Sequence, residues 1–206
     1  KAIDSLWTNQ LLHFEEINIL EIIDKAILDD PELINTLRIK NFKTDINFLI
    51  QQLFHTDFNR CYNSMKELKK HPPEEIFYCL NSNWDSAKGD YGAIYFFINE
   101  YKILLEKGFY DNLLLQKVDF LLSDQWPDYM KFKSSAIQVL GGLNDDKFYD
   151  KLSFFSDESL TPFWKNRYTA LLVLQNKKSI LYRDFAKLFF NDSNRFVRSK
   201  AQQKCF

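Results

Sequence analysis

The chain has 206 residues, of which 46% are hydrophobic and 17% aromatic, and its net charge is −1. It is long enough to bury a sizeable core, and its five glycines and five prolines are too few for an all-β domain of this size. The longest apolar run, residues 93–98, falls short of the roughly 20 residues that a membrane helix needs. The three cysteines (Cys61, Cys79 and Cys205) have no metal-ligand spacing. They predict free thiols in a reducing, cytoplasmic setting.

The first half of the chain predicts short helices. Apolar residues at intervals of three and four predict a helix over residues 7–27, and Asp30-Pro31-Glu32 is typical of a new helix start. Two further helices are expected from near Thr44 to residue 53 and over residues 56–70. Residues 74–80 predict one or two helical turns. The polar stretch 81–89 predicts the main irregular loop.

The second half predicts helices that follow one another closely. A helix over residues 91–107 is expected to stop at Gly108, because glycine readily adopts a left-handed conformation after a helix end. Further helices are expected over residues 110–123, around Ala136 and over residues 145–156. Thr161-Pro162 is typical of the next helix start. Ser179 is expected to cap a helix over residues 180–190, and Ser193 or Asn194 to open the last helix.

One pattern recurs between residues 132 and 206. Ala136, Ala170 and Ala201 lie 34 and then 31 residues apart, each in an apolar-periodic segment. A basic residue stands three positions before each alanine: Lys133, Arg167 and Arg198. A unit that recurs every 20–50 residues predicts stacked helix pairs.

From about residue 91 to residue 206 the chain resembles HEAT-like repeats, the antiparallel helix pairs of armadillo-type α-solenoids. The likeness lies in the alanines and basic residues just described, in Asp192 and Val197, and in Pro127 and Pro162 as openers of first helices. The resemblance implies an Asp–Arg ladder between repeats, at Asp157, Arg167, Asp192 and Arg198. The predicted fold is all-α: a single domain over residues 1–206, forming an α-solenoid of stacked antiparallel helix pairs (a HEAT-like superhelix). Residues 1–90 would be its irregular helical part.

The charge is distributed unevenly along the chain. Residues 1–60 carry a net charge of −4, residues 61–161 carry −5, and residues 162–206 carry +8. The basic end is compatible with a solvated face, with contact to an acidic protein surface, or with nucleic acid stacked on Trp164, Tyr168 and Tyr182. The binding residues expected there are Lys165, Lys177, Lys178, Arg183, Lys187, Arg195 and Lys200.

Trp84 and Asp85 form a second candidate site, because their loop mixes an aromatic residue with carboxylates. This short stretch is similar to the Trp-Asp-Ser segment of HEAT-like alkylpurine DNA glycosylases, which place an aspartate near a flipped-out base. The alternative is structural: Asp90 starts the next helix and Trp84 packs beneath the loop.

No established catalytic motif is present, and the histidines lie far apart in sequence, so neither catalytic residues, a metal site nor a cofactor is expected. The leading hypothesis is a non-catalytic protein-binding scaffold, of the kind found among toxin-neutralising immunity proteins, whose partner has an acidic patch. The alternative is a nucleic-acid-binding protein that resembles the HEAT-like glycosylases. No membrane partner is expected.

Overall fold

The computed structural model describes residue 29 and residues 44–177 and 182–203. These residues form helices and connecting turns without a β-strand among them, which confirms the all-α prediction for this part of the chain. The helices predicted before residue 43, and the Ser179 cap, lie outside the described residues. Across the described ranges, no helix is both long and apolar enough to span a bilayer.

The chain divides into two compact units, residues 1–96 and residues 97–206. The boundary falls inside helix α7 (Tyr91–Glu106). It lies close to residue 90, where the sequence predicted that an irregular helical part ends and the repeats begin. The prediction of one continuous domain stays a prediction, and each unit is described by itself below.

In the described residues of unit 1, α7 is preceded by α4 (Ile46–Gln52), α5 (Phe58–Leu68) and α6 (Pro73–Ala87). The carboxylates of Asp45 and Asp57 cap α4 and α5, accepting hydrogen bonds from the amides of Phe48 and Asn59. The sequence predicted that these helices start at Thr44 and Thr56, so each capping residue lies one position after the predicted start. Helix α4 packs against both α5 and α6, and its apolar residues Leu49 and Ile50 are fully buried.

The loop predicted over residues 81–89 is wrong, because α6 continues through it to Ala87. Leu80, Trp84 and Ala87 keep the spacing of one helical face and are all buried, so this face continues to pack against α4. The polar residues of the stretch lie on the other faces. The side chain of Asn83 donates to the carbonyl of Cys79 at 2.9 Å, one turn earlier, and accepts a hydrogen bond from Nε2 of Gln51 on α4 at 3.3 Å.

Helix α7 ends as the sequence predicts. Gly108 has a φ of 86°, a conformation that disfavours any residue with a Cβ. Its amide donates to the carbonyl of Leu105, and the amide of Phe109 donates to the carbonyl of Leu104, both at 2.9 Å. This is the Schellman arrangement, which satisfies two of the last carbonyls of the helix.

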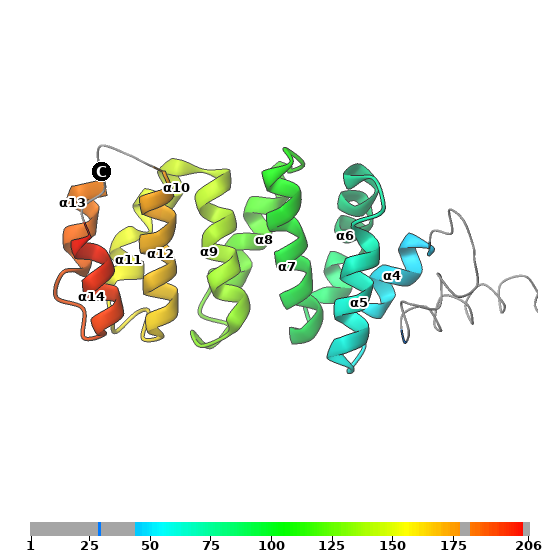
Figure 1. Ribbon diagram of the computed structural model, residues 1–206, viewed down its shortest axis with the longest axis horizontal. Coiled ribbons are helices and arrows are strands. Elements are labelled where there is room, and N and C mark those ends of the chain that lie inside the picture. The colour runs from blue at the N-terminus through cyan, green and yellow to red at the C-terminus, as the bar shows by residue number, and fades with distance from the viewer. Residues whose placement is uncertain (1–28, 30–43, 178–181, 204–206) are drawn as a thin grey trace, which may run out of the picture. The chain divides into compact units, whose positions relative to one another are not determined.

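Unit 2 continues from α7 through seven α-helices and a 3-10 helix in the described residues. They are α8 (Asn112–Leu122), α9 (Lys131–Leu143), α10 (Asp145–Asp150), α11 (Leu152–Ser156), α12 (Trp164–Asn176), α13 (Tyr182–Ala186), η2 (Lys187–Phe189) and α14 (Arg195–Gln202). Helix α9 packs against α8, α10 and α12, and α12 packs in turn against α11, α13 and α14. Figure 1 shows α9, α12 and α14 side by side within this unit.

Ala136, Ala170 and Ala201 lie on these three neighbouring helices, α9, α12 and α14, and all three are buried. A small side chain lets packed helices approach closely, which is the role that the repeat pattern predicts for these positions. The three alanines of the sequence pattern therefore lie buried on helices that contact one another in succession, α9 with α12 and α12 with α14.

Two details of unit 2 differ from the sequence predictions. The helix expected over residues 145–156 is two helices, because Lys151 has a ψ of −3° and ends α10 before α11 begins. Pro127 and Pro162 lie in the turns before α9 and α12, not at the first helical position. The turn before α12 is held instead by Asp128, whose carboxylate accepts a hydrogen bond from the amide of Phe163 at 2.6 Å.

Candidate functional site

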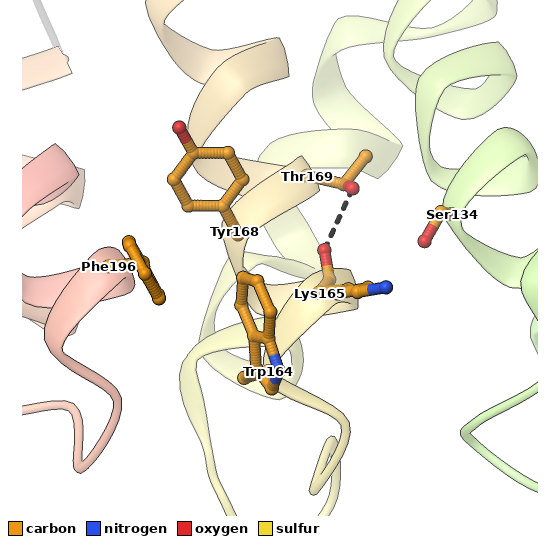
Figure 2. Close-up of a pocket in the computed structure, with 6 residues that line it drawn as sticks. All are labelled: Ser134, Trp164, Lys165, Tyr168, Thr169 and Phe196. Atoms are coloured by element: carbon orange, nitrogen blue, oxygen red, sulfur yellow. Dashed lines mark hydrogen bonds between the residues drawn. The ribbon is translucent and has the colours of Figure 1, made fainter.

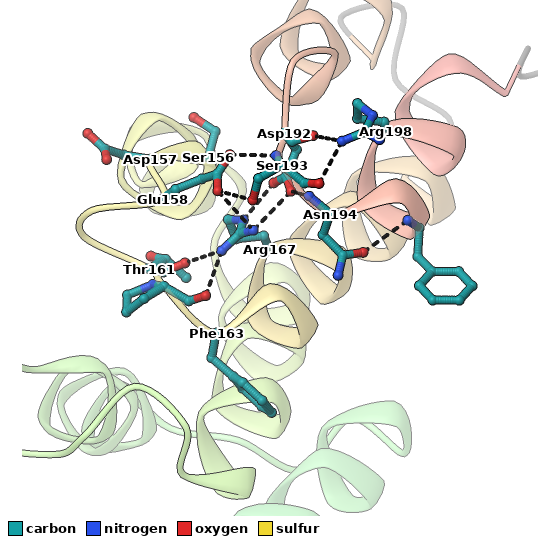
Figure 3. Close-up of polar contacts among 12 residues, drawn as sticks. Ser156, Asp157, Glu158, Thr161, Phe163, Arg167, Asp192, Ser193, Asn194 and Arg198 are labelled. Atoms are coloured by element: carbon teal, nitrogen blue, oxygen red, sulfur yellow. Dashed lines mark hydrogen bonds and ion pairs between the residues drawn. The ribbon is translucent and has the colours of Figure 1, made fainter.

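A buried ion pair joins α12 to the turn that precedes α14 (Figure 3). Nε of Arg167 donates to Oδ2 of Asp192 at 2.6 Å, and Nη2 donates to Oδ1 at 2.9 Å. Nη1 of the same guanidinium donates to the carbonyls of Thr161 and Pro162, at 2.7 and 2.8 Å. The hydrogen bonds to Asp192 raise the pKa of Arg167 above the ordinary value of a guanidinium. The two side chains therefore form the bidentate contact that the predicted ladder requires.

The other ladder positions behave differently. Arg198 donates to the backbone carbonyls of Asp192 and Ser193, which repeats the contact of Arg167 with the two carbonyls before its own helix. Asp157 is the correction: its carboxylate is exposed and accepts hydrogen bonds from the amide and hydroxyl of Ser159, at 2.8 and 2.6 Å. These bonds lower the pKa of Asp157. Asp157 therefore stabilises a local turn, while Glu158 faces Arg167 at 3.6 Å.

Several of the predicted basic binding residues are engaged within the chain. Lys177 forms an ion pair with Asp145, and Lys187 forms one with Asp184 at 2.8 Å. Lys200 donates to a glutamine side chain one turn later. The remaining members are Arg183, which is exposed on α13; Lys165 and Arg195, which lie on aromatic rings; and Lys178, which lies outside the described residues.

Trp84 and Asp85 do not converge on a common site. The Trp84 side chain is buried on the inner face of α6, whereas the Asp85 side chain is 88% exposed and pairs with Lys88 at 2.7 Å. Neighbouring residues on a helix point roughly a quarter-turn or more apart, so the aromatic ring and the carboxylate face different surroundings. A base stacked on Trp84 would therefore not lie beside the Asp85 carboxylate.

An aromatic cleft lies across α9, α12 and α14, with a volume of about 410 Å³ (Figure 2). We use this name for the cavity lined by Ser134, Trp164, Lys165, Tyr168, Thr169 and Phe196. Its apolar surface comes from three rings, two from the first turns of α12 and one from the start of α14. Asn194 caps α14 through the amide of Phe196 at 2.9 Å, which fixes the position of that ring.

The rings of the cleft are ordered against one another. Trp164 and Phe196 are stacked, with centroids 5.6 Å apart and planes inclined by 27°, and Tyr168 meets Trp164 edge-on at 6.2 Å. Although Phe196 belongs to the cleft, it is 50% exposed. Such a surface suits a flat conjugated molecule, because stacking on aromatic rings needs no particular pattern of hydrogen bonds.

The sequence singled out Trp164, Lys165 and Tyr168 but missed the rest of the cleft. Phe196 is 32 residues from Trp164, and no local pattern links the two positions. The signal that finds it is the repeat itself. Position 164 stands six residues before Ala170, and position 196 stands five before Ala201, so both begin equivalent helices.

A second cavity, of about 400 Å³, lies near the other ends of α7, α9 and α12 within unit 2. It is lined by Lys102, Glu106, Gln138, Gly141, Gly142, Leu172, Val173, Asn176 and Lys177. This cavity has no aromatic lining residue, and charges of both signs border it. It therefore offers less surface for a conjugated ligand than the aromatic cleft does.

Comparison with known proteins found two related sequences. The chain is 25% identical over 213 aligned positions to the bilin biosynthesis protein CpeY of Synechococcus sp. (strain WH8020), covering 98% of this chain and 50% of that protein. It is 26% identical over 188 positions to the uncharacterized phycocyanin operon protein Y of Pseudanabaena tenuis (strain PCC 7409), covering 89% of this chain and 41% of that protein. The chain thus spans about half the length of these relatives or less. No family model and no solved structure matches it.

These relatives contradict the functional hypotheses drawn from the sequence. The protein-binding scaffold of the immunity type was inferred from fold and charge. The nucleic-acid-binding alternative was inferred from the same features and from the short Trp84-Asp85 stretch, and such signals say little about function. The names of the relatives point instead to bilin biosynthesis and to the phycocyanin operon. The expected acidic protein partner stays a prediction.

Proposed function

We propose that the chain binds a bilin in the aromatic cleft, as part of a protein that acts in bilin biosynthesis and in attachment of the chromophore to its carrier protein. Similarity to CpeY over almost the whole chain is the observation that carries this proposal. A bilin is a linear, conjugated tetrapyrrole, so it presents flat apolar faces together with polar edges. The stacked Trp164 and Phe196 rings offer the matching surface, and the Tyr168 ring is inclined by 71° to that of Trp164.

The proposed scaffold for this cleft is an α-solenoid of HEAT-like helix pairs. The buried alanines on α9, α12 and α14 support this, as do the equivalent carbonyl contacts of Arg167 and Arg198. Stacked repeats place equivalent helices side by side and so create extended grooves between them. The cytoplasmic location expected from the cysteine usage belongs to the same proposal.

The test is titration of the purified chain with phycocyanobilin, followed by the visible absorbance of the bilin and by tryptophan fluorescence. Trp164→Leu removes the central ring of the cleft and should weaken binding about tenfold, the size expected for one lost stacking contact. The matched control is Phe58→Leu. Phe58 is also exposed and stacked on a neighbouring ring, Tyr62, but lies in unit 1. Equal affinity of Trp164→Leu and the parent chain, or no absorbance change on titration, would contradict the proposal.

A further inference from the structure

Each ring of the stacked pair in the aromatic cleft carries a cation over its face. Nζ of Lys165 lies 5.9 Å from the Trp164 centroid, and Cζ of Arg195 lies 4.8 Å from the Phe196 centroid. In Figure 2 the Lys165 ammonium and the Phe196 ring lie on opposite sides of Trp164. Two positive charges therefore accompany one apolar surface, each supplied by the sequence neighbour of a stacked ring.

These two cations differ from most other basic residues at this end of the chain. Both side chains are exposed, and within the described residues neither forms an ion pair. The carboxylate of Asp128 lies at the start of α12, where it already accepts hydrogen bonds from the Phe163 amide and from Asn166. Lys165 and Arg195 are therefore available to an anionic group of a bound molecule.

The two hydroxyl groups of the cleft offer hydrogen-bond acceptors, in contrast to the two cations. Oγ of Ser134 donates its proton to Oδ1 of Asn166 at 2.7 Å, and Oγ1 of Thr169 donates to the carbonyl of Lys165 at 2.8 Å. The orientation of the Asn166 amide follows from its own bonds, because its Nδ2 donates to Asp128. With their protons directed into the protein, both hydroxyl oxygens are left as acceptors toward the cavity.

We propose that the aromatic cleft recognises a conjugated dicarboxylate whose interior carries N–H donors, with Lys165 and Arg195 each pairing with one carboxylate. The inference rests on the proposed function and specifies which groups of the bilin this site recognises. A bilin has two propionate groups and pyrrole N–H groups. The propionates meet the two cations, and the N–H groups face the hydroxyl oxygens of Ser134 and Thr169. Arg195 offers a bidentate fork and Lys165 a single charge, so the two ends of the site are distinguishable.

The experiment compares phycocyanobilin with its dimethyl ester, which keeps the conjugated system and the N–H groups but removes both negative charges. The parent chain should bind the diacid more tightly, and its advantage should shrink at high salt, because screening weakens exposed ion pairs. Lys165→Gln and Arg195→Gln should each weaken diacid binding about threefold to tenfold, and should weaken ester binding less, so that the preference for the diacid falls. Lys187→Gln is the matched control, since Lys187 is an exposed lysine in unit 2 that does not line the cleft.

The outcomes separate this inference from the proposed function. Equal binding of diacid and ester, with no effect of either substitution, would overturn the pairing of the carboxylates and leave bilin binding intact. Failure of both compounds to bind the parent chain would overturn both proposals. An equal loss of ester and diacid binding in Lys165→Gln would also overturn the pairing, because charge recognition would then not explain the loss. Circular dichroism of each variant verifies that the helices are retained.

Discussion

The buried pair between Arg167 and Asp192 makes a quantitative prediction. Their side chains are 2% and 1% exposed, and the guanidinium donates four hydrogen bonds to the carboxylate and two carbonyls. Asp192→Asn keeps the shape of the side chain but removes its charge, which leaves the buried guanidinium with only the partly exposed carboxylate of Glu158, 3.6 Å away, as a counter-ion. Breaking a buried pair by removing one partner costs about 3–5 kcal/mol.

The assay is urea unfolding followed by circular dichroism, comparing Asp192→Asn with the parent chain. With a urea dependence of about 2 kcal/mol/M, a loss of this size lowers the unfolding midpoint of unit 2 by about 2 M. Asp157→Asn is the matched control, because the sequence pattern assigns Asp157 the same ladder role as Asp192, whereas in the structure Asp157 is exposed and bonded to Ser159. Its midpoint should move far less. Similar midpoints for the two variants would refute the reasoning that burial of the ion pair, rather than repeat position, determines the cost.

Three further predictions concern packing, backbone and titration. Gly141→Ala should destabilise unit 2 by about 1–3 kcal/mol, because a Cβ there would lie 2.2 Å from Cγ1 of Val173, and Val173→Ala should restore most of the loss in the double variant. Gly108→Ala should cost about 1–2 kcal/mol in the same unfolding assay, since the φ of 86° disfavours a side chain. Burial raises the pKa of the Cys61 thiol, so its contribution to stability is present below the ordinary thiol pKa and is lost as the pH rises above it. The unfolding midpoint of the parent chain should therefore fall relative to that of Cys61→Ser between about pH 8 and pH 10, and parallel curves would contradict this.

Helix positions were largely predictable because the local signals act over one or two turns. Gly108 ends α7 and Asn194 caps α14 as expected, since each acts on backbone groups only a few residues away. The loop predicted over residues 81–89 failed for a related reason. Its polar residues suggested a loop, but the buried face of Leu80, Trp84 and Ala87 decided the structure. Burial against α4 is a tertiary effect that local polarity does not reveal.

The candidate site was less predictable, because its parts come from three helices. Lys165 and Tyr168 are visible in sequence as a basic and an aromatic residue, but nothing local shows that Phe196 stacks on Trp164. The directions of the Ser134 and Thr169 hydroxyl protons depend on partners that only the folded chain supplies. Sequence therefore indicated the kinds of residue in the cleft but not their arrangement.

The net charge of +8 over residues 162–206 is interpreted differently once the carboxylate partners of several of its cations are identified. Arg167 holds Asp192 in the interior, Lys177 pairs with Asp145 on α10, and Lys187 pairs with Asp184 within its own segment. Cations used in this way contribute little to a continuous binding surface, because their charge is already compensated. Lys165, Arg183 and Arg195 are exposed, and of these three Lys165 and Arg195 lie over the rings of the aromatic cleft. The basic end of the chain is therefore better explained by two local cations beside an apolar site than by one extended basic face, and this favours a small anionic ligand over a polyanion.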